Sequence, residues 1–120
     1  MLSIKPIYVS KIISGEKRYE YRKKRCKKDV EVVYIYSSRP VKKVIGEFSV
    51  KKIISDSPTK LWNKTCKYGG IDNVSYNKYF DKCDVAYAYV IDKVVLYDNP
   101  KNLKDFGIVS VPQSFVYVNK

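Results

Sequence analysis

Two long extended patterns constrain this chain most: Val41–Ser55 and Val85–Tyr97. Both are rich in β-branched and aromatic residues, the types that favour strands. Gly46 interrupts the first pattern, and Asp92-Lys93 interrupts the second, which is otherwise apolar on both faces. Because glycine inside a strand often marks a bulge or a sharp bend, we expect one at Gly46. Near Asp92-Lys93 we expect a turn or a bulge that resets the register.

Shorter patterns fill the rest of the chain. Proline in the first turn predicts helices beginning at Pro6 and, after a Ser57 cap, at Pro58. A further short helix capped by Ser75 is expected to run to Phe80. Other strands are predicted at Leu2–Lys5, Lys17–Arg22, Val30–Tyr36 and Phe115–Val118. Strands dominate without regular βαβ alternation, which favours an α+β fold: a small, mostly antiparallel β-barrel of five to six strands with two to three flanking helices.

The length of 120 residues predicts a single domain over residues 1–120. Hydrophobic residues make up 45% of the chain, which excludes a disordered tail. No apolar run approaches the ~20 residues that a membrane span needs, and no signal-peptide core is present. We therefore expect a cytoplasmic protein without a membrane partner, and take a monomer as the default.

The charge is strongly positive and unevenly distributed. Lysine and arginine number 24 against 12 acidic residues, for a net charge of +12. Ten of the basic residues but only two of the acidic ones fall within residues 1–28. This asymmetry favours a polyanionic partner, with nucleic acid ahead of an anionic membrane surface. The alternative is a solvated basic face with no partner.

Missing residue types exclude several kinds of chemistry. The chain has no histidine, so mechanisms with a histidine base and sites with a histidine metal ligand are excluded. The three cysteines are Cys26, Cys66 and Cys83, and no two of them form a Cys-x-x-Cys pair. We expect them to be small buried hydrophobic residues, and we expect neither a metal nor a cofactor.

One segment carries a more specific signal. Residues 15–22 read Gly-Glu-Lys-Arg-Tyr-Glu-Tyr-Arg, follow the first predicted helix and open a strand. The pattern Gly-x-Lys-x-x-Glu-x-Arg resembles the signature of the ASCH domain family, whose members share the PUA-like β-barrel fold. Ser3-Ile4-Lys5-Pro6 upstream, and Pro112-Gln113-Ser114-Phe115 near the end, are similar to that family as well.

The resemblance implies a cleft between barrel and helices, with the signature residues on its wall. It also implies an RNA-related role, because PUA domains bind RNA and some ASCH members are reported as ribonucleases. One subgroup hydrolyses an amide on an acylated cytidine with a Lys, a Thr and a Glu. Lys17 matches that Lys, Glu20 stands where the Thr is expected, and the subgroup's Glu aligns with no particular residue here.

The residues themselves support part of this reading. Glu20 and Arg22 lie two apart on a strand, so they share a face and can orient each other. An arginine held by a carboxylate suits a phosphate or a base edge. Lys17 could contact phosphate or, with a lowered pKa, act as a base or nucleophile with Glu20 assisting. The alternative is a surface ion pair contributing ~0–1 kcal/mol.

Three hypotheses follow from these residues. The first is a module that binds RNA or a modified nucleotide; the second is a hydrolase of the same fold, acting on an acylated nucleoside or on RNA. The third is a non-catalytic protein-interaction module. The expected nucleic-acid-binding residues are Lys5, Lys17, Arg18, Glu20, Arg22, Lys23, Lys24 and Arg25, with Lys17 and Glu20 as the catalytic candidates. Among the twelve tyrosines, Tyr19, Tyr21 and Tyr68 are candidates for base stacking.

Overall fold

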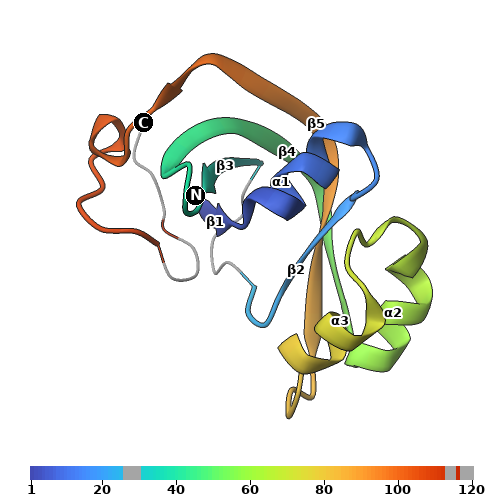
Figure 1. Cartoon of the computed structure of the whole chain (residues 1–120). Coiled ribbons are helices and arrows are strands. Elements are labelled where there is room, and N and C mark those ends of the chain that lie inside the picture. Colours follow the sequence, from blue (N-terminus) through green and yellow to red (C-terminus); the bar gives the residue numbers. More distant parts are fainter. Residues whose placement is uncertain (26–30, 113–115, 117–120) are drawn as a thin grey trace.

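Five strands of this computed structural model form one mixed sheet in the order β1-β3-β4-β5-β2 (Figure 1). β1 pairs with β3 in parallel, whereas all other neighbouring strands are antiparallel. The structure describes residues 1–25, 31–112 and 116. Its strands are β1 (Leu2–Ile4), β2 (Tyr19–Arg22), β3 (Val32–Ser37), β4 (Lys43–Asp56) and β5 (Ala86–Lys101). Its helices are α1 (Pro6–Ser14), α2 (Pro58–Thr65) and α3 (Asn73–Tyr79), with short 3-10 turns η1 (Cys66–Tyr68) and η2 (Leu103–Phe106).

The two long strands bend where the sequence predicts. The β4–β5 register shifts beside Gly46, where a Cβ atom would collide with the carbonyl oxygen of Val95. It shifts again opposite Asp92 and Lys93, and the Lys93 amide donates to the Ser49 hydroxyl at 2.9 Å. Both interruptions of the strand pattern are therefore real irregularities, and they let the sheet curl (Figure 1).

The curled sheet does not close, so "barrel" describes it only loosely. Among the described residues, the edge strands β1 and β2 form no ladder with each other. Both strands are short, and Pro6 starts α1 immediately after β1. A side chain crosses the gap instead: the Arg22 Nη2 donates to the carbonyl oxygen of Ser3 at 3.0 Å. The α+β prediction is confirmed, and its barrel is corrected to an open sheet.

Helix α1 begins at the predicted proline. Pro6 lies in the first turn, and Lys5 provides no side-chain cap. Gly15 ends the helix with φ 86°, a left-handed conformation that glycine adopts without strain. Val9 and Ile12 are buried and pack into the core cluster formed by β1, β3, Phe48 and Tyr89. This packing fixes α1 beside the open edge of the sheet.

The insertion between β4 and β5 forms α2, η1 and α3. Ser57 caps α2 by accepting from the Lys60 amide, as predicted. The cap of α3 is Asp72 rather than Ser75: the Asp72 carboxylate accepts from the Ser75 amide at 2.6 Å and from its hydroxyl at 3.0 Å. The helix begins at Asn73, so Ser75 lies inside its first turn and Asp72 holds the cap position.

An aromatic cluster joins this insertion to β2. The ring of Tyr21 packs edge-on against Tyr76 and Phe80 of the insertion, with centroids 5.0 and 6.2 Å apart. Leu61 of α2 and Ala88 of β5 complete the same buried cluster. Figure 1 shows α2 and α3 together on this flank of the sheet, away from β1. The packing brings α3 opposite α1 across the end of β2.

Several further expectations need correction or lie outside the described residues. Cys66 is exposed and Cys83 is half-buried, so the prediction of buried cysteines is wrong for both. Cys26 and the predicted strand at residues 115–118 are outside the described part of the chain, except for Val116. In that described part, no helix has the length and apolar character needed to cross a membrane.

Candidate functional site

A cavity of about 440 Å³ opens between the two edge strands of the sheet. β1 and α1 form one side of it, β2 forms the back, and α3 forms the other side. Its volume falls within the range of about 300–1,000 Å³ that is typical of small-molecule sites. The polar and aromatic residues of its lining are Ser3, Lys5, Tyr8, Lys17, Glu20, Tyr21, Arg22, Ser75, Lys78 and Tyr79.

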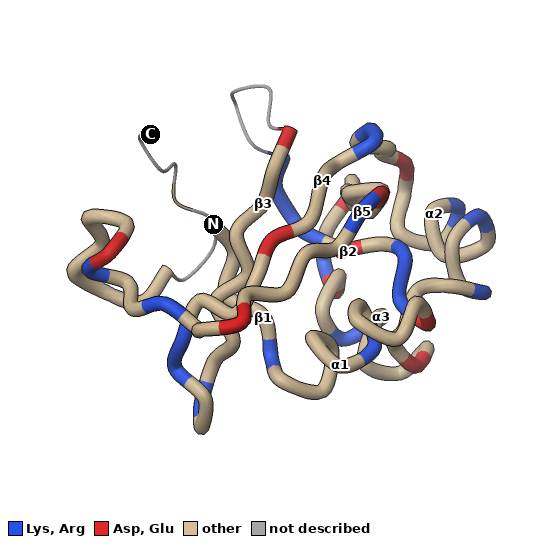
Figure 2. Tube along the Cα trace, turned by 90° about the horizontal axis from the view of Figure 1, so that it is seen from above, with Lys and Arg blue, Asp and Glu red and all other residues tan. Residues whose placement is uncertain are grey.

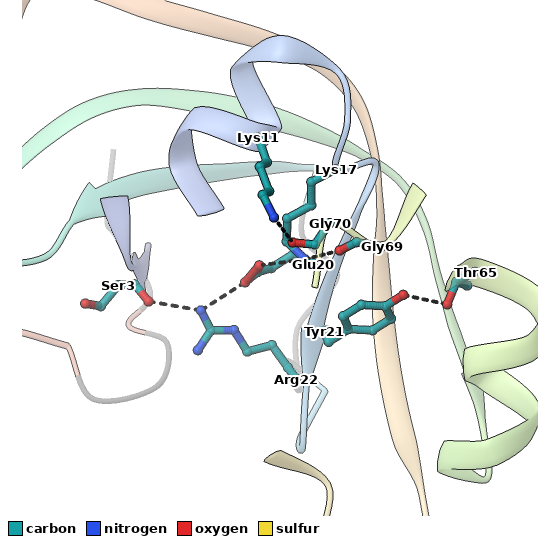
Figure 3. A network of polar contacts seen from close by, with 9 residues as sticks. All are labelled: Ser3, Lys11, Lys17, Glu20, Tyr21, Arg22, Thr65, Gly69 and Gly70. Carbon is teal, nitrogen blue, oxygen red and sulfur yellow. Dashed lines mark hydrogen bonds and ion pairs between the residues drawn. The ribbon is translucent and has the colours of Figure 1, made fainter. Parts of the chain in front are cut away.

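Lys17 is a buried cation in the lining of this cavity, only 3% exposed. Its Nζ donates to the carbonyl oxygen of Gly69 at 2.7 Å and lies 4.8 Å from the ring centroid of Tyr21 (Figure 3). Burial lowers the pKa of the Lys17 ammonium, while the neighbouring Glu20 carboxylate acts in the opposite direction. A lysine with a lowered pKa can exchange a proton more readily near neutral pH than an exposed one.

Glu20 lies between two cations. One carboxylate oxygen accepts from Arg22 Nη2 at 3.1 Å, and the other is 3.9 Å from Lys17 Nζ. The residue is 5% exposed. Both cations reduce the cost of burying this charge. A carboxylate offers about four lone-pair positions, so Glu20 keeps accepting capacity for a ligand.

Arg22 is held in place without being fully satisfied. Its Nη2 donates both to Glu20 and to the Ser3 carbonyl oxygen, across the gap between β2 and β1 (Figure 3). Its Nε is buried and has no hydrogen-bond partner among residues 1–25, 31–112 and 116. A buried donor without a partner is costly and therefore rare in folded proteins. Here it belongs to a side chain that lines the cavity.

A loop strap, residues 68–70, lies against Lys11, Lys17 and Arg18. Three consecutive carbonyl oxygens accept hydrogen bonds: Tyr68 from the Arg18 amide at 2.7 Å, Gly69 from Lys17 Nζ, and Gly70 from Lys11 Nζ at 3.3 Å. The strap thus docks on the segment that leads into β2 and holds the Lys17 side chain.

Two glycines make this docking possible. A Cβ at Gly69 would collide with the Tyr21 hydroxyl. Gly70 has φ +66°, and a Cβ there would lie 2.5 Å from Lys17 Cβ. The pair therefore does more than turn the chain, because any larger residue would push against the site.

A hydrogen bond to α2 holds Tyr21 beside the site. Its hydroxyl is 2.7 Å from Thr65 Oγ1, which itself donates to the Leu61 carbonyl oxygen. Since threonine has one hydroxyl hydrogen, Tyr21 is the donor in its bond to Thr65. Burial raises the pKa of Tyr21 to about 12. Tyr21 is thus a neutral support that lines the cavity with only 6% of its surface exposed, too little for a base to stack on its ring.

The structure separates the expected nucleic-acid-binding residues into two groups. Lys5, Lys17, Glu20 and Arg22 line the cavity. Arg18 points outward, with its guanidinium 4.1 Å from the Tyr68 ring centroid. The exposed residues Lys23, Lys24 and Arg25 continue beyond β2, where Figure 2 shows an unbroken basic stretch. β2 begins only at Tyr19, so strand alternation does not extend to the two residues before it: Lys17 is buried and Arg18 is exposed.

Sequence reasoning missed the contribution of the helices to the cavity. Tyr8 of α1, with Ser75, Lys78 and Tyr79 of α3, lines the cavity as well. Nothing in their local sequence marks them, because their position depends on how the insertion packs on β2. No group of three or more acidic or cysteine side chains gathers as metal ligands would within residues 1–25, 31–112 and 116.

Comparison with known proteins places this geometry in a family. The model of the ASCH domain matches residues 2–95. A crystal structure of ASCH from Zymomonas mobilis superposes with a TM-score of 0.89 at 26% identity, covering 99% of this chain and 86% of that one. The PUA-like fold implied by the signature is thereby confirmed.

Two curated relatives extend the comparison. An ASCH domain-containing ribonuclease of Zymomonas mobilis is 27% identical over 92 residues, which are 76% of this chain and 62% of that protein. A Ureaplasma parvum protein named large ribosomal subunit protein uL22 is 33% identical over 86 residues, which are 72% of this chain. The chain spans only 28% of that second protein. With the family model covering most of its length, this chain belongs to the ASCH domain family.

Proposed function

We propose that this chain binds single-stranded RNA and takes one of its nucleotides into the cavity beside Lys17, Glu20 and Arg22. The net charge of +12 favours a polyanionic ligand. A relative in Zymomonas mobilis is named a ribonuclease, which supports RNA as the polyanion. RNA is usually read in single strands, because only an unpaired base can enter a pocket.

The observation that carries this proposal is the buried Nε of Arg22, which has no hydrogen-bond partner in the described part of the chain. Arg22 lines a cavity of nucleotide-compatible volume and is already oriented by Glu20 and by the Ser3 carbonyl oxygen. A ligand acceptor near Nε would satisfy this donor. Glu20 beside it would accept an N–H group of the same ligand. Base edges present such acceptors and donors side by side.

A second candidate function, hydrolysis, is favoured by the state of Lys17. Its lowered pKa makes a neutral amine more accessible, and Glu20 lies 3.9 Å from its Nζ. A neutral Lys17 could accept the proton of an attacking hydroxyl, either the 2′-hydroxyl of RNA or a water attacking an acylated nucleoside. In the first case the 2′-oxygen bonds to phosphorus as the bond to the 5′-oxygen breaks, and the Lys17 ammonium returns the proton to that oxygen. In the second case the water oxygen bonds to the acyl carbon as its bond to nitrogen breaks, and the proton goes to the leaving amine.

Matched arginine variants test the binding proposal. Arg22→Ala removes the donor in the cavity, whereas Arg18→Ala removes an exposed arginine four residues earlier. We expect Arg22→Ala to weaken binding of a labelled single-stranded RNA at least tenfold, and Arg18→Ala to weaken it less than threefold. Circular dichroism and thermal unfolding verify that both variants are folded. Equal affinity of Arg22→Ala and wild type would contradict the proposal.

The hydrolase candidate has its own test. Wild type is incubated with RNA and separately with acylated nucleosides, and products are detected on gels and by mass spectrometry. Turnover that disappears in Lys17→Met but persists in Lys11→Met supports catalysis by Lys17. Full turnover by folded Lys17→Met excludes that role, and RNA binding without any product leaves the protein as a binding module.

A further inference from the structure

We propose that the mouth of the cavity holds phosphate groups through Lys5 and Lys78, while its interior accepts only an uncharged base. This inference rests on the proposed function and names the substrate class more narrowly. The ligand is an unpaired nucleotide that carries its phosphate or phosphodiester, and a free nucleoside is a poor substitute.

The interior is unsuited to a phosphate. Glu20 is a buried carboxylate, and both neighbouring cations already have partners. Lys17 donates to Gly69, and Arg22 Nη2 donates to Glu20 and Ser3. A phosphate placed there would repel the Glu20 carboxylate at short range and would have to displace it from Lys17 and Arg22, the two cations that it already pairs with. A neutral group with N–H donors and an acceptor meets no such repulsion.

The mouth has the opposite character. Lys5 at the start of α1 and Lys78 in α3 are both exposed, and both line the cavity. In the described part of the chain, neither ammonium group forms an ion pair or a hydrogen bond. Lys64, by contrast, is paired with Asp56 at 2.8 Å. Unpaired ammonium groups on two sides of one opening are suited to phosphate oxygens.

Two aromatic rings connect the mouth with the interior. Tyr8 follows Lys5 by three residues on α1, and Tyr79 is adjacent to Lys78 on α3; both line the cavity. The Lys23 ammonium lies 4.9 Å from the Tyr79 ring centroid and adds positive charge on that side. A base that passes between α1 and α3 meets a ring on each side, and its phosphates then remain beside the lysines.

The experiment compares two double variants with the same loss of charge. Lys5→Gln/Lys78→Gln changes the mouth, and Lys51→Gln/Lys104→Gln changes two exposed lysines that are not in the cavity lining. Binding of a labelled, mixed-sequence single-stranded RNA is measured across a salt series. The four ribonucleosides and their 5′-monophosphates are then used as competitors.

We expect the mouth variant to bind at least tenfold more weakly and the control variant less than threefold. Loss of two phosphate contacts lowers the slope of log affinity against log salt by about 1.4. Monophosphates should compete at least tenfold better than nucleosides with wild type, and this advantage should disappear in the mouth variant.

Three outcomes overturn the inference. One is equal weakening by both double variants, and another is equal competition by nucleosides and monophosphates. In either case, weakened binding by Arg22→Ala would leave the proposed function intact, so the two failures are distinguishable. The third is a wild type that binds no RNA, which rejects the proposed function and the phosphate-binding mouth together.

Discussion

Two neighbouring basic segments differ sharply in how the fold uses them. In residues 17–22 the charged side chains of Lys17, Glu20 and Arg22 line a cavity and are held by hydrogen bonds. In residues 23–25 all side chains are exposed, and apart from the contact of Lys23 with the Tyr79 ring their charges face the solvent. The comparison shows that fixed geometry comes from burial and partners, whereas the number of basic residues contributes only a long-range attraction.

Removing the charge of Glu20, the anion between Lys17 and Arg22, should have the largest effect on the free energy of unfolding. Glu20→Gln keeps the shape but leaves Lys17 and Arg22 as buried cations without a counter-charge. Breaking a buried ion pair in this way costs about 3–5 kcal/mol of the free energy of unfolding. Glu16→Gln, which changes an exposed carboxylate on the same segment, should change it by less than about 0.5 kcal/mol. Urea unfolding measures the free energy of unfolding of both variants. Equal losses would contradict the contrast between the buried and the exposed charges.

Crowding the strap should have the next largest effect. Gly70→Ala adds a Cβ at positive φ that lies 2.5 Å from Lys17 Cβ. Gly107→Ala adds one at φ +74° with no atom within 4 Å. Strain alone costs about 1 kcal/mol, and collision adds about 1–3 kcal/mol. Thermal unfolding should therefore show a larger loss of stability for Gly70→Ala than for Gly107→Ala. Gly70→Ala should also bind RNA more weakly, whereas Gly107→Ala should bind it as wild type does.

The lowered pKa of Lys17 predicts a pH dependence of stability. Between that pKa and the ordinary value of about 10.4, the unfolded chain binds more protons than the folded one. The free energy of unfolding should therefore gain a rising contribution as pH increases through this window. Lys17→Met should lack this contribution, whereas Lys64→Met, which alters an exposed lysine, should retain it.

The range for this measurement ends at about pH 10, the ordinary pKa of tyrosine. Above it the raised pKa of Tyr21, about 12, acts in the opposite direction, because the unfolded chain loses the tyrosine proton first. If the free energy of unfolding changed with pH in the same way for wild type and Lys17→Met below pH 10, burial would not lower the pKa of Lys17.

The smallest effect is expected in the exposed segment. Lys24→Gln and Arg25→Gln should each weaken binding of single-stranded RNA by less than threefold at moderate salt, because screened surface charges contribute little. Their effect should grow at low salt. A loss as large as that of Arg22→Ala would make the exposed turn, rather than the cavity, the main binding surface.

Local sequence signals predicted much of the fold and one wall of the site. Pro6 and Gly15 bound α1, and Gly46 marks the bend of β4, because each acts through its own backbone. The pairing of Glu20 with Arg22 follows from strand spacing. The inward position of Lys17 and the contributions of Tyr8, Lys78 and Tyr79 depend on tertiary packing, which no local pattern encodes.

Zero-length crosslinking tests most directly whether a base occupies the cavity. A mixed-sequence single-stranded RNA is irradiated with short-wavelength ultraviolet light in complex with wild type, and crosslinked peptides are identified by mass spectrometry. Our account predicts base adducts on Tyr8 or Tyr79, which line the cavity, and their loss in Arg22→Ala. Adducts confined to Tyr68 or to residues 23–25 would contradict it, because they would place the bases on the outer surface.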